Sequence, residues 1–175
     1  MSTVLLQTQI EDLFQSITSQ LLGVTDPSVV RIGWPEGGAP AWAIGEDVCF
    51  LLVNYADNPI TRQMETVYSQ ADSTNATATL AYTVVVRVNW TLYGPDAFDY
   101  ADVIRSGLFQ EPTKAALAQN NLALVTDVMM PVRAPELFNG QWWNRATFYA
   151  EFNELVIRQS TVPYIQTAPV TTQEG

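Results

Sequence analysis

Carboxylates are the side chains in this chain whose spacing allows chemistry. Asp96, Asp99 and Asp102 recur every three residues at the start of a predicted helix, so they lie on neighbouring parts of one helical surface. Oxygen ligands placed in this way hold metal ions or act as acid/base pairs in hydrolysis. Negative charge is also favoured in the first turn of any helix by the helix dipole. We therefore interpret these acids as a solvated helix start and expect no metal site.

Other catalytic chemistries lack the residues that they need. The chain has no histidine, which excludes Ser-His-Asp and Cys-His arrangements and removes the commonest zinc ligand. Gly37-Gly38 is not followed by the Lys and Ser or Thr of a phosphate-binding loop, and Lys114 has no neighbours that support a Schiff base. Cys49, the one cysteine, lies in an apolar run and is predicted to be a buried thiol. We expect neither catalysis nor a cofactor.

Aromatic residues give the best residue-level indication of an interface. Trp142 and Trp143 are adjacent on a predicted strand, where successive side chains point to opposite faces. One of the two must therefore contact a helix, a loop or a partner. Tryptophan and arginine are enriched at the centres of interfaces, and Arg145 follows this pair. We interpret Arg145, with Glu136 nearby in the sequence, as a structural clasp.

The balance of charges limits the partners. Acidic residues outnumber basic ones 18 to 8, for a net charge of −10, whereas binding nucleic-acid phosphates requires a basic face. No apolar run approaches the ~20 residues that cross a bilayer, and no secretory signal is visible. We expect a protein made in a reducing cytoplasm, with no membrane partner and no specific nucleic-acid binding.

A strand that leads directly into a helix organises the chain. Residues 80–93 are rich in β-branched and aromatic side chains. Gly94 allows the backbone to turn, and Pro95 is expected at the first helical position, where a missing N–H costs nothing. The apolar side of the strand is formed by Val84, Val86, Val88, Trp90 and Leu92, and that of the helix by Phe98, Ala101, Ile104 and Leu108.

The remaining pattern predicts an α+β fold. Helices are expected from Thr8 to Leu22, opened by a Thr8–Glu11 capping box, and from Pro112 to Gln119. Strands are expected at 46–55, 61–70, 122–132 and 142–157, and a mobile hairpin tip at 71–79. The predicted architecture is a mostly antiparallel or mixed sheet flanked by two to three helices, with a long hairpin. Residues 1–159 are expected to form a single domain and 160–175 an extended or flexible C-terminal tail.

Four segments carry distinctive combinations of Trp, Pro, Gly and Arg. They are RIGWPEGGAPAW (31–42), GEDVCFLLV (45–53), WTLYGPDAFDYADVIRSGL (90–108) and VRAPELFNGQWWNRATFYAEFNE (132–154). In order and spacing these segments resemble the neck or tail terminator proteins of long-tailed bacteriophages. The resemblance covers most of the chain from Arg31 to Glu154, and none of the four segments is a catalytic signature.

This resemblance implies a small α+β protein that assembles with copies of itself into a ring, usually six-fold, at the head-proximal end of the tail tube. Such a ring stops growth of the tube protein, offers a surface to the head-tail connector or stopper protein, and lets DNA pass through its lumen without specific binding. The protein is expected to assemble in the host cytoplasm and to reside at the neck of the virion. Matching positions are expected to serve fold and ring architecture: Trp34, Pro35, Trp42, Tyr93, Gly94, Pro95, Pro135, Glu136, Phe138, Trp142, Trp143 and Arg145.

Three alternatives remain open at this point. Another virion ring, such as a head-completion connector or a tube protein, has the same general character, but a tube protein polymerises into long filaments. A small cytoplasmic ligand-binding domain or hydrolase would use the acids between Asp96 and Asp102, or Glu136. An inhibitor or antitoxin-like protein would exploit the net negative charge. If the ring interpretation holds, we expect an acidic lumen that repels the DNA backbone.

Overall fold

The computed structural model describes residues 4–33 and 42–163. Within these residues, three α-helices accompany a seven-stranded sheet and a separate two-stranded hairpin, which confirms the predicted α+β class. The helices are α1 (Gln7–Leu22), α2 (Ala97–Gly107) and α3 (Glu111–Gln119), with one 3-10 turn, η1 (Pro59–Arg62). The strands are β1 (Val30–Ile32), β2 (Val48–Tyr55), β3 (Glu65–Gln70), β4 (Asn75–Tyr93), β5 (Leu122–Leu124), β6 (Val132–Arg133), β7 (Glu136–Phe138), β8 (Gln141–Trp143) and β9 (Arg145–Pro163).

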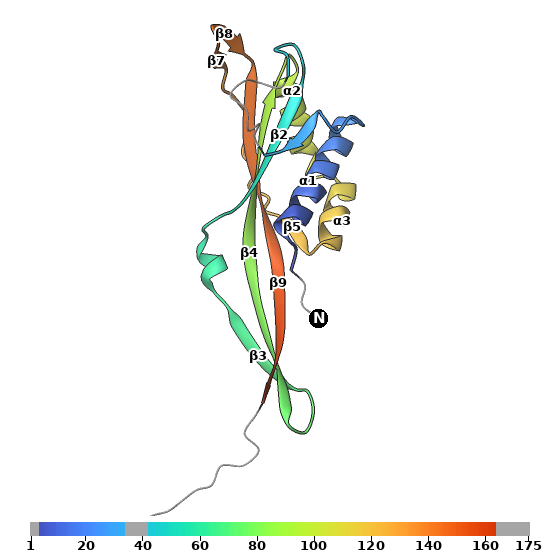
Figure 1. The fold of residues 1–175 in the computed structure, drawn as a ribbon, viewed down its shortest axis with the longest axis vertical. Coiled ribbons are helices and arrows are strands. Elements are labelled where there is room, and N and C mark those ends of the chain that lie inside the picture. The colour runs from blue at the N-terminus through green and yellow to red at the C-terminus, as the bar shows by residue number, and fades with distance from the viewer. Residues whose placement is uncertain (1–3, 34–41, 164–175) are drawn as a thin grey trace, which may run out of the picture.

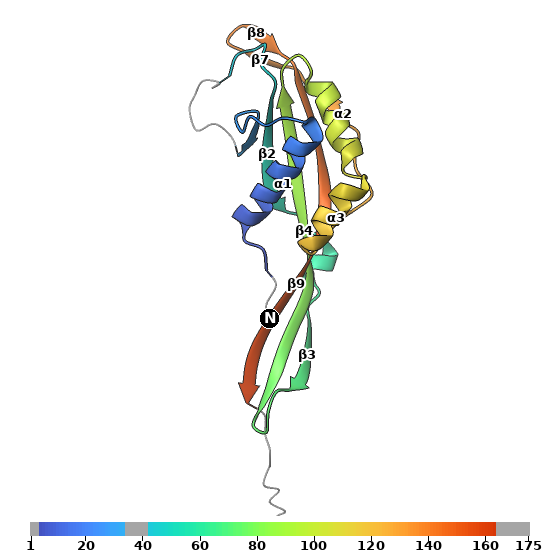
Figure 2. The same ribbon diagram turned by 90° about the vertical axis from the view of Figure 1, so that its right-hand side faces the viewer.

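The sheet is mixed and is covered by helices on one face. Its strand order is β1-β2-β4-β9-β5, with β3 also paired to β4 and β6 to β9. Strand β4 runs antiparallel to β2, β3 and β9, and β1 runs parallel to β2. Helices α1, α2 and α3 all lie on the same side of the upper part of the sheet (Figure 1, Figure 2). The opposite face has no α-helix over it among the described elements; only η1 lies beside its lower part (Figure 1).

The apolar side of β4 forms the core under the helices, as the sequence predicts. Trp90 is fully buried, and its indole Nε1 donates a hydrogen bond to Thr18 Oγ1 of α1 at 3.0 Å. The same ring stacks on Phe148 of β9 with centroids 4.8 Å apart, and Phe14 of α1 contacts Trp90 at 6.3 Å and Phe152 at 4.5 Å. These contacts fix α1 across both long strands. Cys49 is buried on the neighbouring strand β2, as expected.

Two predicted helix starts are wrong in detail. Helix α1 begins at Gln7, and Gln9 Oε1 accepts a hydrogen bond from Leu6 N at 2.8 Å, so the Thr8–Glu11 capping box does not form. Helix α2 begins at Ala97, because Gly94 and Pro95 are both used by the turn that reverses the chain. Pro95 therefore lies before the helix rather than at its first position.

The strand predicted at 122–132 is also wrong. Only 122–124 and 132–133 pair with β9. Between them, Arg105 of α2 holds the chain away from the sheet by donating to the carbonyl oxygens of Met129 at 3.0 Å and Val128 at 3.1 Å. The strand expected at 61–70 starts at Glu65, after η1, and the strand expected at 142–157 is divided at Asn144 into β8 and β9.

The long strands continue well beyond the helices. Strands β4 and β9 have 19 residues each, or about 60 Å at ~3.3 Å per residue. Their lower parts, residues 75–81 and 157–163, form with β3 a three-stranded extension that we call the distal ribbon (Figure 1). The hairpin tip predicted at 71–79 is shorter than expected, because β4 already begins at Asn75 and residues 76–79 pair with β3. In the turn that remains, Asp72 Oδ1 accepts hydrogen bonds from the backbone N–H groups of Thr74 and Asn75. Strand β9 runs to Pro163, and the rest of the predicted tail lies outside the described residues.

Candidate functional site

Most of the sequence-predicted site residues gather at the end of the molecule opposite the distal ribbon. There Trp42, Phe50, Tyr93 and Trp143 form a small core of their own with Val48. The Trp42 ring lies 4.9 Å from Phe50, 5.3 Å from Tyr93 and 5.9 Å from Trp143, measured between centroids. We call this group the aromatic cluster. It lies on the face of the sheet that no described α-helix covers, because Phe50 and Tyr93 alternate with the residues that face the α-helices.

The β7–β8 hairpin places two adjacent tryptophans in opposite environments. Trp143 packs into the aromatic cluster and is 8% exposed, whereas Trp142 points to the other side of the hairpin and is 66% exposed. Leu137 lies directly opposite Trp142 on the paired strand and is 57% exposed. Alternation therefore produces one buried anchor and one exposed apolar pair from a single short segment. Phe138 lies edge-on to Trp143 at 6.4 Å.

A partly buried clasp joins this hairpin to the sheet. Glu136 Oε2 accepts hydrogen bonds from Tyr93 Oη at 2.8 Å and from Arg145 Nη1 at 3.0 Å. Burial, together with the hydrogen bond to the Glu136 carboxylate, raises the pKa of Tyr93 above its ordinary value, because both disfavour the phenolate. Arg145 and Glu136 therefore lie together, and Tyr93, another of the positions marked by the family resemblance, is the third member of the clasp.

The corner between β4 and α2 requires glycine. Gly94 has φ of +117°, and a Cβ atom built there would lie 2.7 Å from the carbonyl oxygen of Glu46 and from the Cα of Asp47. The Asp47 carboxylate in turn accepts a hydrogen bond from Asp96 N at 3.0 Å. Burial is the main cause that raises the pKa of Asp47. The start of β2 and the start of α2 are thus held in contact at this corner.

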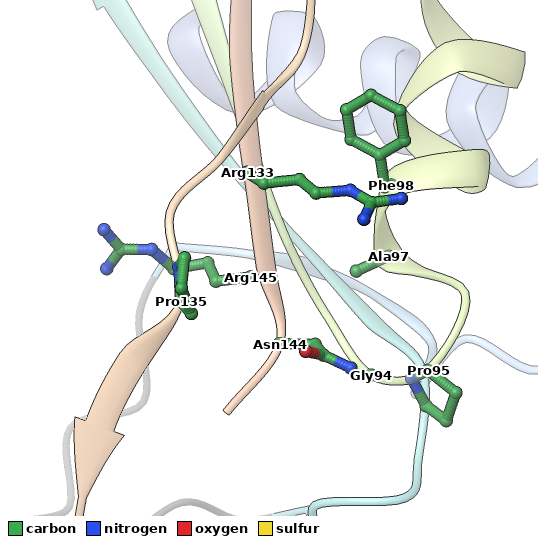
Figure 3. A pocket seen from close by; sticks show the side chains of 8 residues that line it. All are labelled: Gly94, Pro95, Ala97, Phe98, Arg133, Pro135, Asn144 and Arg145. Carbon is green, nitrogen blue, oxygen red and sulfur yellow. The ribbon is translucent and has the colours of Figure 1, made fainter. Parts of the chain in front are cut away.

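A hollow of about 300 Å³ lies beside this corner. Its walls are Gly94, Pro95, Ala97 and Phe98 from the β4–α2 corner, and Arg133, Pro135, Asn144 and Arg145 from the segments on either side of the hairpin (Figure 3). The guanidinium of Arg133 stacks over the Phe98 ring at 4.4 Å. The side chain of Arg145 extends the other way, behind Pro135 (Figure 3).

The carboxylates that the sequence offers for chemistry do not converge. Asp96, Asp99 and Asp102 are all exposed on or beside α2, and Glu136 is occupied by Tyr93 and Arg145. Among residues 4–33 and 42–163 there is no group of three or more His, Cys, Asp or Glu side chains that could hold a metal ion. The geometry therefore provides no support for a hydrolase.

Some site residues could not be found from the sequence. Phe50, Phe98 and Arg133 join the site through contacts between distant segments. The helical spacing of Phe98 indicated only that it lies on the apolar side of α2. Within the described part of the chain, Trp42 Nε1, Trp143 Nε1 and Arg145 Nε are buried without an acceptor. Trp34 and Pro35 lie outside the described residues.

The arrangement is thus an aromatic-rich end with an exposed apolar pair and a hollow. A family model described as a phage neck terminator protein matches residues 8–175. The chain belongs to the phage neck terminator protein family. The curated proteins contain no match to it.

Family membership gives this neck terminator protein a structural role in the phage tail or neck. It points to a virion component that associates with other tail or head proteins, and away from an enzyme. No described helix has the length and apolar character needed to span a membrane.

Proposed function

We propose that this protein closes into a ring on the head-proximal end of the tail tube, stops tube growth and joins the tail to the head connector or stopper protein. Family membership supports the location. The main structural support for ring assembly is the pair of open strand edges on the distal ribbon.

The distal ribbon has one open edge on each side. Strand β3 pairs with β4 alone, and residues 157–163 of β9 likewise pair with β4 alone among the described strands. All six residues of β3 are exposed, including Val67 at 56% and Tyr68 at 66%. An exposed edge strand with apolar side chains and no lysine is a template for pairing with another chain.

These two edges are at the same height along the molecule, because β3 and residues 157–163 flank the same stretch of β4. Pairing β3 of one copy with β9 of the next joins two different surfaces. Such a heterologous contact gives a ring when its rotation closes, and a closed sheet has no edge left. Both strands run antiparallel to β4, so the new pair would be parallel.

The face of the sheet without α-helices is the face that we assign to the lumen. On β4 and β9 its charged residues are Arg87, Arg145 and Glu151. Arg87 pairs with Glu151 at 2.6 Å and Arg145 with Glu136 at 3.0 Å, and many of the other positions on this face are Thr or Asn. We therefore infer a polar, nearly neutral lumen rather than the strongly acidic one suggested by the net charge. It offers DNA phosphates no unpaired cation from these two strands.

Sedimentation and negative-stain microscopy, with and without purified tail tubes, test this function. We expect discrete rings and a single cap at one end of each tube, and tubes that no longer elongate. Long filaments of the protein alone would identify a tube protein instead, and a chain that stays monomeric on its own and ignores tubes would contradict the proposal.

An edge-blocking variant tests the pairing itself. Val67→Lys places a charge on the open edge of β3, which is a device by which natural sheets prevent edge pairing. We expect a folded protein that forms no rings. Val103→Lys is the matched control, because Val103 is also an exposed valine, at 44%, but lies on α2; this variant should form rings normally. Rings of undiminished stability from Val67→Lys would contradict the edge-pairing proposal.

A further inference from the structure

Leu137 and Trp142 form an exposed apolar pair at the aromatic end, with no contact that accounts for it among the described residues. Trp142 is the more exposed of the two, at 66%, on a hairpin whose other side is anchored by Trp143. An exposed tryptophan on an anchored hairpin is typical of an interface residue that fills a pocket on a partner. Neither member of the pair lines the hollow of its own molecule.

The hollow beside the β4–α2 corner has the size and lining of such a pocket. Its volume is about 300 Å³, and an apolar cavity of ~150 Å³ already admits a benzene ring. A two-ring indole therefore fits. Pro95, Phe98 and Pro135 give apolar walls, and Asn144 offers an acceptor to an indole N–H.

Arg133 supplies the second reason to expect an aromatic occupant. Its guanidinium covers Phe98 on one side at 4.4 Å, and it forms no ion pair with any carboxylate of the described residues. The residue is exposed, so its other face remains available. Arginine stacks preferentially on tryptophan among aromatic rings, and the β7–β8 strands carry no cation that would repel it.

We propose that Trp142 of one copy inserts into the hollow of the next copy and stacks on Arg133. This inference rests on the proposed ring. It names a contact at the aromatic end that is independent of the strand edges of the distal ribbon. The two surfaces are different and lie at the same end of the molecule, as the head-to-tail contacts of a ring require.

Single-cysteine additions that keep Trp142 test the contact. Leu137→Cys places a thiol beside Trp142, and Pro95→Cys places one on the wall of the hollow. A short bis-maleimide should link the two variants when they are mixed under ring-forming conditions, but neither variant to itself. The wild type should not react, because Cys49 is buried.

The deciding measurement is whether the cross-link yield depends on the indole ring of Trp142. Adding Trp142→Ala to the Leu137→Cys variant should lower the cross-link yield about ten-fold or more, and Trp142→Phe should restore much of it. Tyr55→Ala, which removes an aromatic side chain exposed to a similar extent at 61%, should leave the yield unchanged. Circular dichroism checks that each variant folds.

The opposing outcomes separate this inference from the proposed function. Two outcomes would refute the proposed Trp142 contact and leave the ring proposal standing. In the first, rings form and cap tubes but the cross-link does not appear; in the second, the cross-link yield is unchanged by Trp142→Ala. A cross-link of Leu137→Cys to itself would show a symmetric hairpin contact and also overturn it. Absence of any ring would overturn both proposals.

Discussion

Replacement of Gly94 by alanine should be one of the most damaging small changes in this protein. The residue has φ of +117°, a region that costs a residue with a Cβ about 1–3 kcal/mol. The new methyl group would also lie 2.7 Å from Glu46 O and Asp47 Cα. These are backbone atoms that cannot rotate away, and such overpacking costs a further ~1–3 kcal/mol. We expect a loss of about 3–5 kcal/mol from a total stability of ~5–15 kcal/mol.

Urea unfolding followed by tryptophan fluorescence measures this loss, and a thermal melt should show a fall of roughly 6–20 °C. Gly140→Ala is the matched control, because Gly140 has φ of +76° but no atom within 4 Å of the place that a Cβ would take; it should lose only ~1–2 kcal/mol. If Gly94→Ala proves no worse than Gly140→Ala, then the close approach of β2 to the corner is not what requires glycine, and the reasoning fails.

Two further predictions concern buried polar contacts. Thr18→Val should cost about 1–3 kcal/mol in urea unfolding, because it leaves Trp90 Nε1 buried without an acceptor; a neutral result would mean that this hydrogen bond does not hold α1 to β4. Tyr93→Phe removes the hydrogen bond to Glu136. The folded state raises the pKa of Tyr93 from 10.0, so stability tied to its protonated form is present below that value and lost as pH rises through the raised pKa. The difference in free energy of unfolding between wild type and Tyr93→Phe, measured at about pH 8 and about pH 11, should therefore be smaller at the higher pH. A difference that stays constant or grows would contradict a stabilising role for the Tyr93–Glu136 hydrogen bond.

Local patterns were sufficient for the central unit and for the class of fold. The alternation of Val86, Val88, Trp90 and Leu92 requires one face of β4 to be buried, and the spacing of Ala101, Ile104 and Leu108 places α2 against that face. The adjacency of Trp142 and Trp143 also meant that one of them had to leave the core. These conclusions depend only on periods of two and of about 3.6 residues, which are fixed by backbone geometry.

Local patterns failed where a distant contact decided the outcome. The apolar run 122–132 resembles a strand, but Arg105 binds the carbonyl groups of Val128 and Met129 and removes them from the sheet. The hollow likewise exists only because Phe98 and Arg133 meet across two segments. The local spacing of apolar residues cannot predict a hydrogen bond or a cation–π contact between residues so far apart in the chain.

Composition and spacing alone were enough to predict an α+β protein without histidine, and its distinctive segments indicated a phage neck role. The fold was needed to show that β4 and β9 extend beyond the α-helices and have two open edges among the described strands, and that an exposed tryptophan and a hollow lie at one end. Amino-acid type and spacing set which face of each element is buried. Where an element ends, and what its edge meets, depends on which other segments come to lie beside it.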